Sequence, residues 1–214
     1  MLLTGLDWKH FNWQQMEFHG QLNLLKTGIV FADTISTVSP RYAQEIQTPA
    51  FGCGLEGVLA ARRDVLYGIL NGVDYSVWNP ATDPHIVAPY DENTVWERKP
   101  LCKRALQQEL GLPVRPDVPL VTMIGRLTHQ KGFDTVAKVL PHWLEHGEDV
   151  QFAILGTGEL ELEQSFRQFA DRWPQKIVAR IEFCQPLAHR IHAAGDMLLM
   201  PSRFEPCGLT QLQA

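Results

Sequence analysis

Charged residues and glycine occur together where a predicted strand of this 214-residue chain ends. The string IGRLTHQKGFD follows an apolar run at 118–125, which ends in Gly125, and it carries Arg126 and Lys131. A guanidinium can bind an anion through two parallel hydrogen bonds, and an ammonium adds a compact charge. The N-terminus of the helix expected from Gly132 would add positive potential. This pattern predicts an oxyanion clamp, although a solvated loop with two surface charges would give the same short string.

A second loop, SRFEPCGLTQ, places Glu205 between a strand end and a helix that we expect to begin near Cys207. The backbone N–H groups that would face an incoming anion are those of Cys207, Gly208, Leu209 and Thr210. Glu205 could then accept hydrogen bonds from substrate hydroxyls. A carboxylate that only caps its own helix, worth about 1 kcal/mol, is the alternative. The position of Glu205 at the same sheet edge as Arg126 and Lys131 favours a functional site.

Other motifs are weaker indicators of chemistry. The loop ILGTGE at 154–159 has the G-x-G of a nucleotide-binding turn but lacks the third glycine, so a tight strand-to-helix turn explains it as well. Two histidine pairs, His142 with His146 and His189 with His192, have helical spacing that could suit a metal. Because no third ligand follows from the spacing, we interpret them as exposed or half-buried helix residues and predict no metal site.

The elements that must position these loops alternate regularly from residue 118 onward. We expect strands at 118–125, 150–156, 177–183 and 196–202, and helices at 133–147, 159–173 and 187–194. Short apolar strands that alternate with helices predict βαβ units and a parallel, doubly wound α/β sheet. Ligands of such sheets bind beyond the carboxyl ends of the strands, where the loops above lie.

The preceding part of the chain is less regular. We expect a helix over 21–34, a strand over 35–40 in which Ser39 caps a following helix, and a strand over 66–70. The segment Trp78–Asp91 is rich in proline and turn residues, which is typical of a linker. A helix with Pro100 in its first turn and Gly111 at its end would open the second unit. Both ends of the chain resemble interruptions of larger domains.

Composition narrows the classes of partner and location. Hydrophobic residues make up 45% of the chain, charged residues 20%, and the formal net charge is -5, which argues against nucleic acid as the main partner. No apolar run approaches the roughly 18 residues of a membrane helix, and we expect neither a signal peptide nor a membrane partner. Four cysteines without paired spacing predict a reducing, cytoplasmic location.

Four long strings, in order, resemble the bacterial glycogen synthase and plant starch synthase family. They are LKTGIVFADTISTVSPRYAQEIQTPAFGCGLEGVL, GILNGVDYSVWNPATDPHI, IGRLTHQKGFD and PSRFEPCGLTQ. The resemblance extends from about Phe11 to the end and implies an internal fragment of a retaining GT-B glycosyltransferase. It implies an α/β fold with part of an N-terminal Rossmann-like domain at 1–90, and a truncated C-terminal nucleotide-sugar-binding domain with a parallel sheet at 91–214.

The resemblance also implies the reaction and its partners. Family members transfer glucose from ADP-glucose to the non-reducing end of an α-1,4-glucan such as glycogen, with retention and without a metal or other cofactor. Glu205 then matches the catalytic-site glutamate that contacts the glucosyl hydroxyls, and Arg126 and Lys131 match the pair that holds the donor diphosphate. The resemblance alone leaves the oligomeric state open, and the fragment by itself is expected to be inactive.

Further residues are implied to bind substrate or nucleotide. They are Asn71 and Gly72 of the NGVD segment, Gly125, Phe183 as an aromatic partner of adenine, and Cys207, Gly208, Leu209 and Thr210 at the donor-binding helix. The chain also departs from the family pattern. A Lys-Thr-Gly-Gly loop and an N-terminal-domain histidine of the family have no match, and the second glutamate of an E-x7-E pattern is replaced by Gln213. A non-catalytic nucleotide- or glucan-binding fragment, or a GT-B transferase or phosphorylase with another donor, are the alternatives.

Overall fold

The computed structural model describes residues 4–147 and 149–214. The chain forms two units, Met1–Asn71 and Gly72–Ala214, and each is described by itself. The second unit contains both loops of the predicted clamp.

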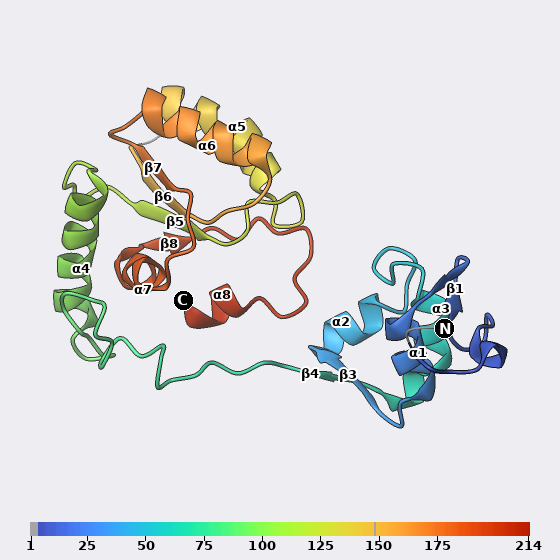
Figure 1. Cartoon of the computed structure of the whole chain (residues 1–214). Helices are drawn as coiled ribbons and strands as arrows, with labels where there is room; N and C mark the ends of the chain where they lie inside the picture. The colour runs from blue at the N-terminus through green and yellow to red at the C-terminus, as the bar shows by residue number, and fades with distance from the viewer. Residues whose placement is uncertain (1–3, 148) are drawn as a thin grey trace. The chain divides into compact units, whose positions relative to one another are not determined.

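A parallel four-stranded sheet is the centre of the second unit, as the alternating pattern predicted (Figure 1). Its strands are β5 (Leu120–Ile124), β6 (Gln151–Leu155), β7 (Ile177–Arg180) and β8 (Met197–Leu198). They lie in the order β7-β6-β5-β8, so the chain moves outward from β5 to β7 and returns to the other side of β5 with β8. In register, Ile124 pairs with Leu155 and Leu155 with Arg180, which brings the carboxyl ends of β5, β6 and β7 to one edge.

Helices cover both faces of this sheet. The helices of the unit are α4 (Val95–Leu110), α5 (Phe133–His146), α6 (Leu160–Arg172), α7 (Gln185–Ala194) and α8 (Leu209–Gln213). Helices α5 and α6 cover one face, and α4 and α7 cover the other (Figure 1). Fully buried side chains such as Phe152, Phe166, Leu106 and Ile191 fill the two interfaces. Each such side chain contributes roughly 1.5–3 kcal/mol by leaving water, so the apolar stripes of the helices hold the layers together.

The beginning of α4 differs from the expectation. The helix starts at Val95, and Pro100 lies inside it rather than in its first turn. Its end is as predicted, because Gly111 adopts the left-handed conformation (φ 74°) that suits a residue without a Cβ atom. A proline in the second turn of a helix removes one backbone donor, and burial of Cys102 and Leu106 on the same helix offsets that loss.

The segment predicted to be a linker belongs to the core of the second unit. Ile86 and Ala88 are buried in the cluster that contains α4 and α7, and the Tyr90 hydroxyl donates to the Ala193 carbonyl oxygen at 3.2 Å. Proline and turn residues here produce an irregular but packed strap rather than a free connection. The contacts divide the chain after Asn71, whereas the family domain limits of 1–90 and 91–214 stay a prediction.

The first unit contains short elements. They are a 3-10 helix at Trp8–His10, β1 (Glu17–Phe18), β2 (Gln21–Leu22), α1 (Leu24–Phe31), β3 (Ile35–Val38), α2 (Pro40–Glu45), α3 (Glu56–Ala61), a 3-10 helix at Arg63–Val65 and β4 (Leu66–Ile69). Strands β3 and β4 pair in parallel, and the Ser39 hydroxyl caps α2 by accepting from the Tyr42 backbone N–H, as predicted.

A hairpin replaces the start of the helix that was expected from residue 21. Strands β1 and β2 pair antiparallel around His19 and Gly20, whose φ angles are 51° and 79°. Two consecutive positive φ values are typical of the tight turn that matches strand twist, and this turn delays α1 until Leu24.

Among the described residues, no helix combines the length and the apolar character needed to cross a lipid bilayer.

Candidate nucleotide-sugar site

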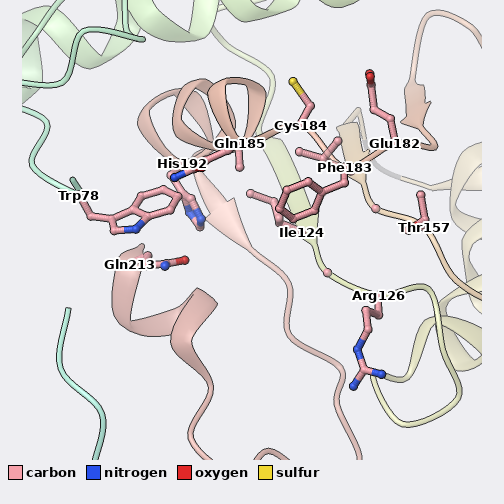
Figure 2. Close-up of a pocket in the computed structure, with 14 residues that line it drawn as sticks. Trp78, Ile124, Arg126, Thr157, Glu182, Phe183, Cys184, Gln185, His192 and Gln213 are labelled. Carbon is pink, nitrogen blue, oxygen red and sulfur yellow. The ribbon is translucent and has the colours of Figure 1, made fainter. Parts of the chain in front are cut away.

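A pocket of about 470 Å³ opens at the carboxyl ends of β5, β6 and β7 (Figure 2). Its lining comprises Trp78, Ile124, Gly125, Arg126, Leu155, Gly156, Thr157, Glu182, Phe183, Cys184, Gln185, Ala188, His192 and Gln213. Trp78 and Gln213 lie at one end of the view and Arg126 at the other, with Phe183 and Ile124 between them. The pocket therefore has an aromatic end and a charged end, at the edge where parallel sheets bind their ligands.

Backbone hydrogen bonds hold the floor of the pocket. The Gly125 N–H donates to the Leu155 carbonyl oxygen at 3.1 Å, and the Gly156 N–H donates to that of Arg180 at 3.1 Å. A Cβ atom on Gly156 would lie 1.8 Å from the Gly125 carbonyl oxygen, so only glycine allows this approach. The G-x-G string, weak by itself, is thus a structural requirement of the predicted clamp loop.

Arg126 lies at the charged end of the pocket. Its guanidinium donates to the side-chain oxygen of Gln130 at 3.1 Å, and this partner is neutral. Among the residues that the structure describes, no carboxylate lies within ion-pair distance of Arg126. The positive charge is therefore available to an anion in the pocket.

Lys131 and Glu205, predicted from separate loops, are brought together by the fold. The Lys131 Nζ atom lies 2.6 Å from Glu205 Oε1, and the side chains are 22% and 17% exposed. The Ser202 hydroxyl also donates to Glu205 Oε1 at 2.6 Å. Both donors reach the same oxygen, so the carboxylate is held in a fixed orientation with Oε2 left on its other side.

The helix after Glu205 begins later than expected. Helix α8 starts at Leu209, and Gly208 precedes it in the left-handed conformation (φ 76°). Thr210 follows in the first turn, whereas Cys207 lies before the helix. The N–H group of Cys207 thus lies before the unpaired donors of the helix start, and the donor-binding role of residues 207–210 stays a prediction.

Phe183, which the family resemblance indicated, lines the pocket with a side chain that is 93% exposed. Strand β7 ends at Arg180 instead of 183, and this early end places Phe183 in the loop that leads to α7. An apolar ring that is exposed in this way has its face available for stacking on a flat ligand.

The opposite aromatic wall was missed by the sequence interpretation. Trp78 stacks on His189 with ring centroids 3.9 Å apart and planes 4° apart, and it meets His192 edge-on at 5.5 Å. His189 is 3% exposed, and its Nδ1 atom lies 2.6 Å from Asp83 Oδ2. His189 is therefore a buried, carboxylate-bound residue rather than the exposed or half-buried histidine that its helical spacing suggested. The W-N-P-A-T-D string contains Trp78 and Asp83, but its turn composition gave no sign of the Trp78 stacking or of the burial of Asp83.

His192 gives the aromatic end a neutral polar group. Burial, then the nearby His189 and Lys99, lower the pKa of His192 to about 4 from the ordinary value of 6.5. The imidazole is therefore uncharged at neutral pH, in contrast to Arg126 at the other end of the pocket.

Asn71 and Gly72 lie at the junction of the two units, as exposed residues outside helices and strands. Their substrate-binding role stays a prediction. Within the described residues, no cluster of three or more metal-ligating side chains occurs.

Comparison with known proteins places this geometry in a fold class. The chain superposes on the catalytic domain of starch synthase IV from Arabidopsis thaliana, solved with ADP and acarbose, with a TM-score of 0.89 and 34% identity. The match covers 98% of this chain and 43% of that one. A second structure, Anabaena HepE with UDP and glucose, matches at a TM-score of 0.54 and 17% identity and supports the fold alone. The α/β architecture is that of a GT-B glycosyltransferase.

Two family profiles and curated relatives give the finer assignment. Residues 1–61 match the starch synthase catalytic domain, and residues 118–214 match glycosyl transferases group 1. A glycogen synthase of Anaeromyxobacter sp. is 54% identical over 97% of this chain, and one of Pseudothermotoga lettingae is 50% identical over 99%. The chain belongs to the glycogen synthase and starch synthase family, and it spans about 43% of the length of these two relatives.

Proposed function

We propose that the protein to which this chain belongs transfers glucose from ADP-glucose to the non-reducing end of an α-1,4-glucan, with retention of the anomeric configuration. The second unit would hold the donor. The observation that carries this proposal is that Lys131 meets Glu205 on the segments that follow the neighbouring strands β5 and β8. The pocket beyond β5, β6 and β7 adds Arg126 at one end and aromatic rings toward the other. These groups correspond to the three parts of the donor: diphosphate, sugar and base.

The charged end suits the leaving group of glycosyl transfer. Cleavage of the anomeric C–O bond leaves negative charge on the nucleotide diphosphate, and the transition state is oxocarbenium-like at the sugar. Arg126 would grip phosphate oxygens through two N–H groups, and Lys131 would add a charge without a proton transfer. Fixed cations of this kind stabilise developing charge without reorganisation, and removal of one such donor costs about 2.7–4 kcal/mol of barrier in a well-studied hydrolase.

Glu205 is best suited to positioning the glucosyl unit. Its Oε1 atom already accepts from Lys131 and Ser202, so Oε2 is the oxygen that we expect to accept from a sugar hydroxyl. A simple double displacement would need a second carboxylate as nucleophile, and position 213 of the looser family pattern is Gln213. We therefore favour a front-face displacement, in which the leaving phosphate guides the acceptor hydroxyl.

The aromatic end would select the base. Phe183 offers an exposed ring face in the middle of the pocket, and Trp78 lies at the end away from Arg126 (Figure 2). Adenine would pack against such rings, whereas the neutral imidazole of His192 supplies a hydrogen-bonding group without charge. The Arabidopsis relative was solved with ADP, which agrees with this assignment.

Two measurements test the proposal. Calorimetry with the 214-residue chain should detect ADP and show weaker binding of UDP. For activity, the chain would replace the matching segment of the Anaeromyxobacter glycogen synthase, to which it is 54% identical. This chimera should transfer glucose from ADP-glucose to glycogen, and the product linkage is read by nuclear magnetic resonance.

The outcomes separate the alternatives. Tighter binding of UDP than of ADP would indicate another donor. Binding of ADP without transfer by a folded chimera would indicate a non-catalytic nucleotide-binding module.

The scarcity of cysteines supports a cytoplasmic location for the protein, which cell fractionation would test.

A further inference from the structure

We propose that Arg203 is a positioning residue that sets the register between the loop at 126–132 and the segment at 199–205, so that the Lys131 ammonium meets the Glu205 carboxylate. Arg203 lies two residues before Glu205 and contacts none of the atoms assigned to the reaction. The importance of this register for donor binding rests on the proposed function, whereas the register itself does not.

The two segments approach too closely for a loose connection. Gly132 has a φ of 74°, and a Cβ atom there would lie 2.1 Å from the Pro201 carbonyl oxygen. The backbone N–H of Arg203 donates to the Gln130 carbonyl oxygen at 3.0 Å. These contacts fix the distance between the segments but not their rotation about the Arg203–Gln130 hydrogen bond, so a second point of attachment is needed.

The Arg203 side chain removes that freedom. Its Nη1 and Nη2 atoms donate to the two carboxylate oxygens of Asp134 at 2.6 and 2.9 Å, a bidentate geometry. Nη1 also donates to the His129 carbonyl oxygen, and Nη2 donates to the Thr135 hydroxyl at 3.2 Å. The Arg203 guanidinium thus connects the segment at 199–205 to residues on both sides of Lys131. His129 precedes Lys131 in the loop, and Asp134 and Thr135 follow it in the first turn of α5.

The ion pair between Arg203 and Asp134 stays formed at neutral pH. Hydrogen bonding from Arg203 lowers the pKa of Asp134 to about 2, so the carboxylate is ionised at neutral pH. Asp134 also lies within ion-pair distance of His129 (3.4 Å) and Lys138 (3.9 Å), but neither makes a bidentate contact. Arg203→Lys would keep the positive charge but lose the bidentate hydrogen bond to Asp134, so its effect should be intermediate.

A ligand-free measurement tests the register first. In the 214-residue chain, the ammonium group of Lys131 should give a protected side-chain 1H–15N signal, assigned by its loss in Lys131→Met. The signal should survive Arg172→Gln, a matched surface arginine on α6 that pairs with Glu145, and vanish in Arg203→Gln. An unchanged signal in a folded Arg203→Gln chain would overturn the proposal.

A double-mutant cycle on ADP affinity tests the consequence. Arg203→Gln should weaken ADP binding about tenfold, with Arg203→Lys intermediate and Arg172→Gln unchanged. If Arg203 acts through Lys131, then Lys131→Met should cost about tenfold in the wild-type chain but less than about twofold in Arg203→Gln. Fully additive losses would contradict that route. If the wild-type chain does not bind ADP, the proposed function fails, and the ammonium signal still decides the register.

Discussion

The charged and aromatic ends of the pocket are built in different ways. At the charged end, Arg126 has no carboxylate partner among the described residues. Farther along the same loop, outside the lining of the pocket, Lys131 pairs with Glu205 at 2.6 Å while both side chains stay partly exposed. At the other end, Trp78 rests on the buried Asp83–His189 pair. Surface ion pairs are weak but adaptable, whereas buried hydrogen-bonded groups are rigid.

This difference suggests that the two ends of the pocket have different functions. The charged end can attract a ligand anion, because Arg126 has no carboxylate partner among the described residues and Lys131 and Glu205 hold each other in place. The aromatic end keeps one shape, because removing either member of the Asp83–His189 pair would leave a buried polar group unsatisfied. We therefore expect the charged end to govern the reaction rate and phosphate affinity, and the aromatic end to govern the choice of base.

The largest effect is expected at Glu205. In the chimera, Glu205→Gln should lower kcat by about 100- to 1,000-fold, because the amide keeps an oxygen that can accept from Lys131 but loses the charged oxygen that accepts from the sugar. The ADP affinity should change little. Glu161→Gln on the exposed first turn of α6 is the matched control. Steady-state kinetics with glycogen check this expectation, and near-normal turnover would remove Glu205 from the catalytic role.

Arg126→Gln should affect only ligands that carry phosphate, because Arg126 lies at the charged end of the pocket. Arg126→Gln should weaken binding of ADP to the chain by about 10- to 100-fold, since a hydrogen bond to a charged group is worth about 1.5–3 kcal/mol. Binding of adenosine, which has no phosphate, should be unchanged. Arg167→Gln, an exposed arginine paired with Glu163 at 3.8 Å, serves as the control. Calorimetry that finds equal losses for both ligands would mean that Arg126 shapes the whole pocket.

Phe183 should give the complementary pattern. Phe183→Ala should weaken ADP and adenosine by the same factor, about 2- to 12-fold, from the lost stacking of roughly 0.5–1.5 kcal/mol. Because the ring is 93% exposed, the melting temperature should not change. Trp96→Ala on α4, also exposed (87%), controls for the loss of a surface aromatic residue. A loss confined to ADP would place Phe183 at the phosphates instead of the base.

The alternating pattern of the second half predicted much of this arrangement. Strand runs that end at Gly125 and Gly156 predicted the sheet edge, and the shared edge predicted that Lys131 and Glu205 would lie close together. Local patterns succeed here because each βαβ unit is formed by neighbours in the sequence. The same local patterns also gave Gly111 as the end of α4.

The parts that were wrong or missed depend on contacts distant in sequence. Asp83 and His189 are 106 residues apart, and nothing in the turn-rich composition around Trp78 indicates that this segment packs on α7. Pro100 was placed in a first turn because propensity favours it there, but the helix begins at Val95, and Lys99 in its added turn donates to the carbonyl oxygens of His192 and Ala193 on α7. Tertiary packing therefore overrides local preference at the aromatic end of the pocket more than at the charged end.

The smallest expected effect on ligand affinity concerns pH and the aromatic end. Because burial lowers the pKa of His192 to about 4, the unfolded chain binds this proton more tightly than the folded chain. The stability of the second unit should thus be fully present above pH 6.5, and His192 should remove up to about 3 kcal/mol as the pH falls toward 4. Adenosine affinity should stay constant between pH 6.5 and 8, where the His192 imidazole stays uncharged. Nuclear magnetic resonance of the His192 ring tests this directly. A titration midpoint near 6.5 would mean that water reaches the imidazole and that the aromatic end is as open as the charged one.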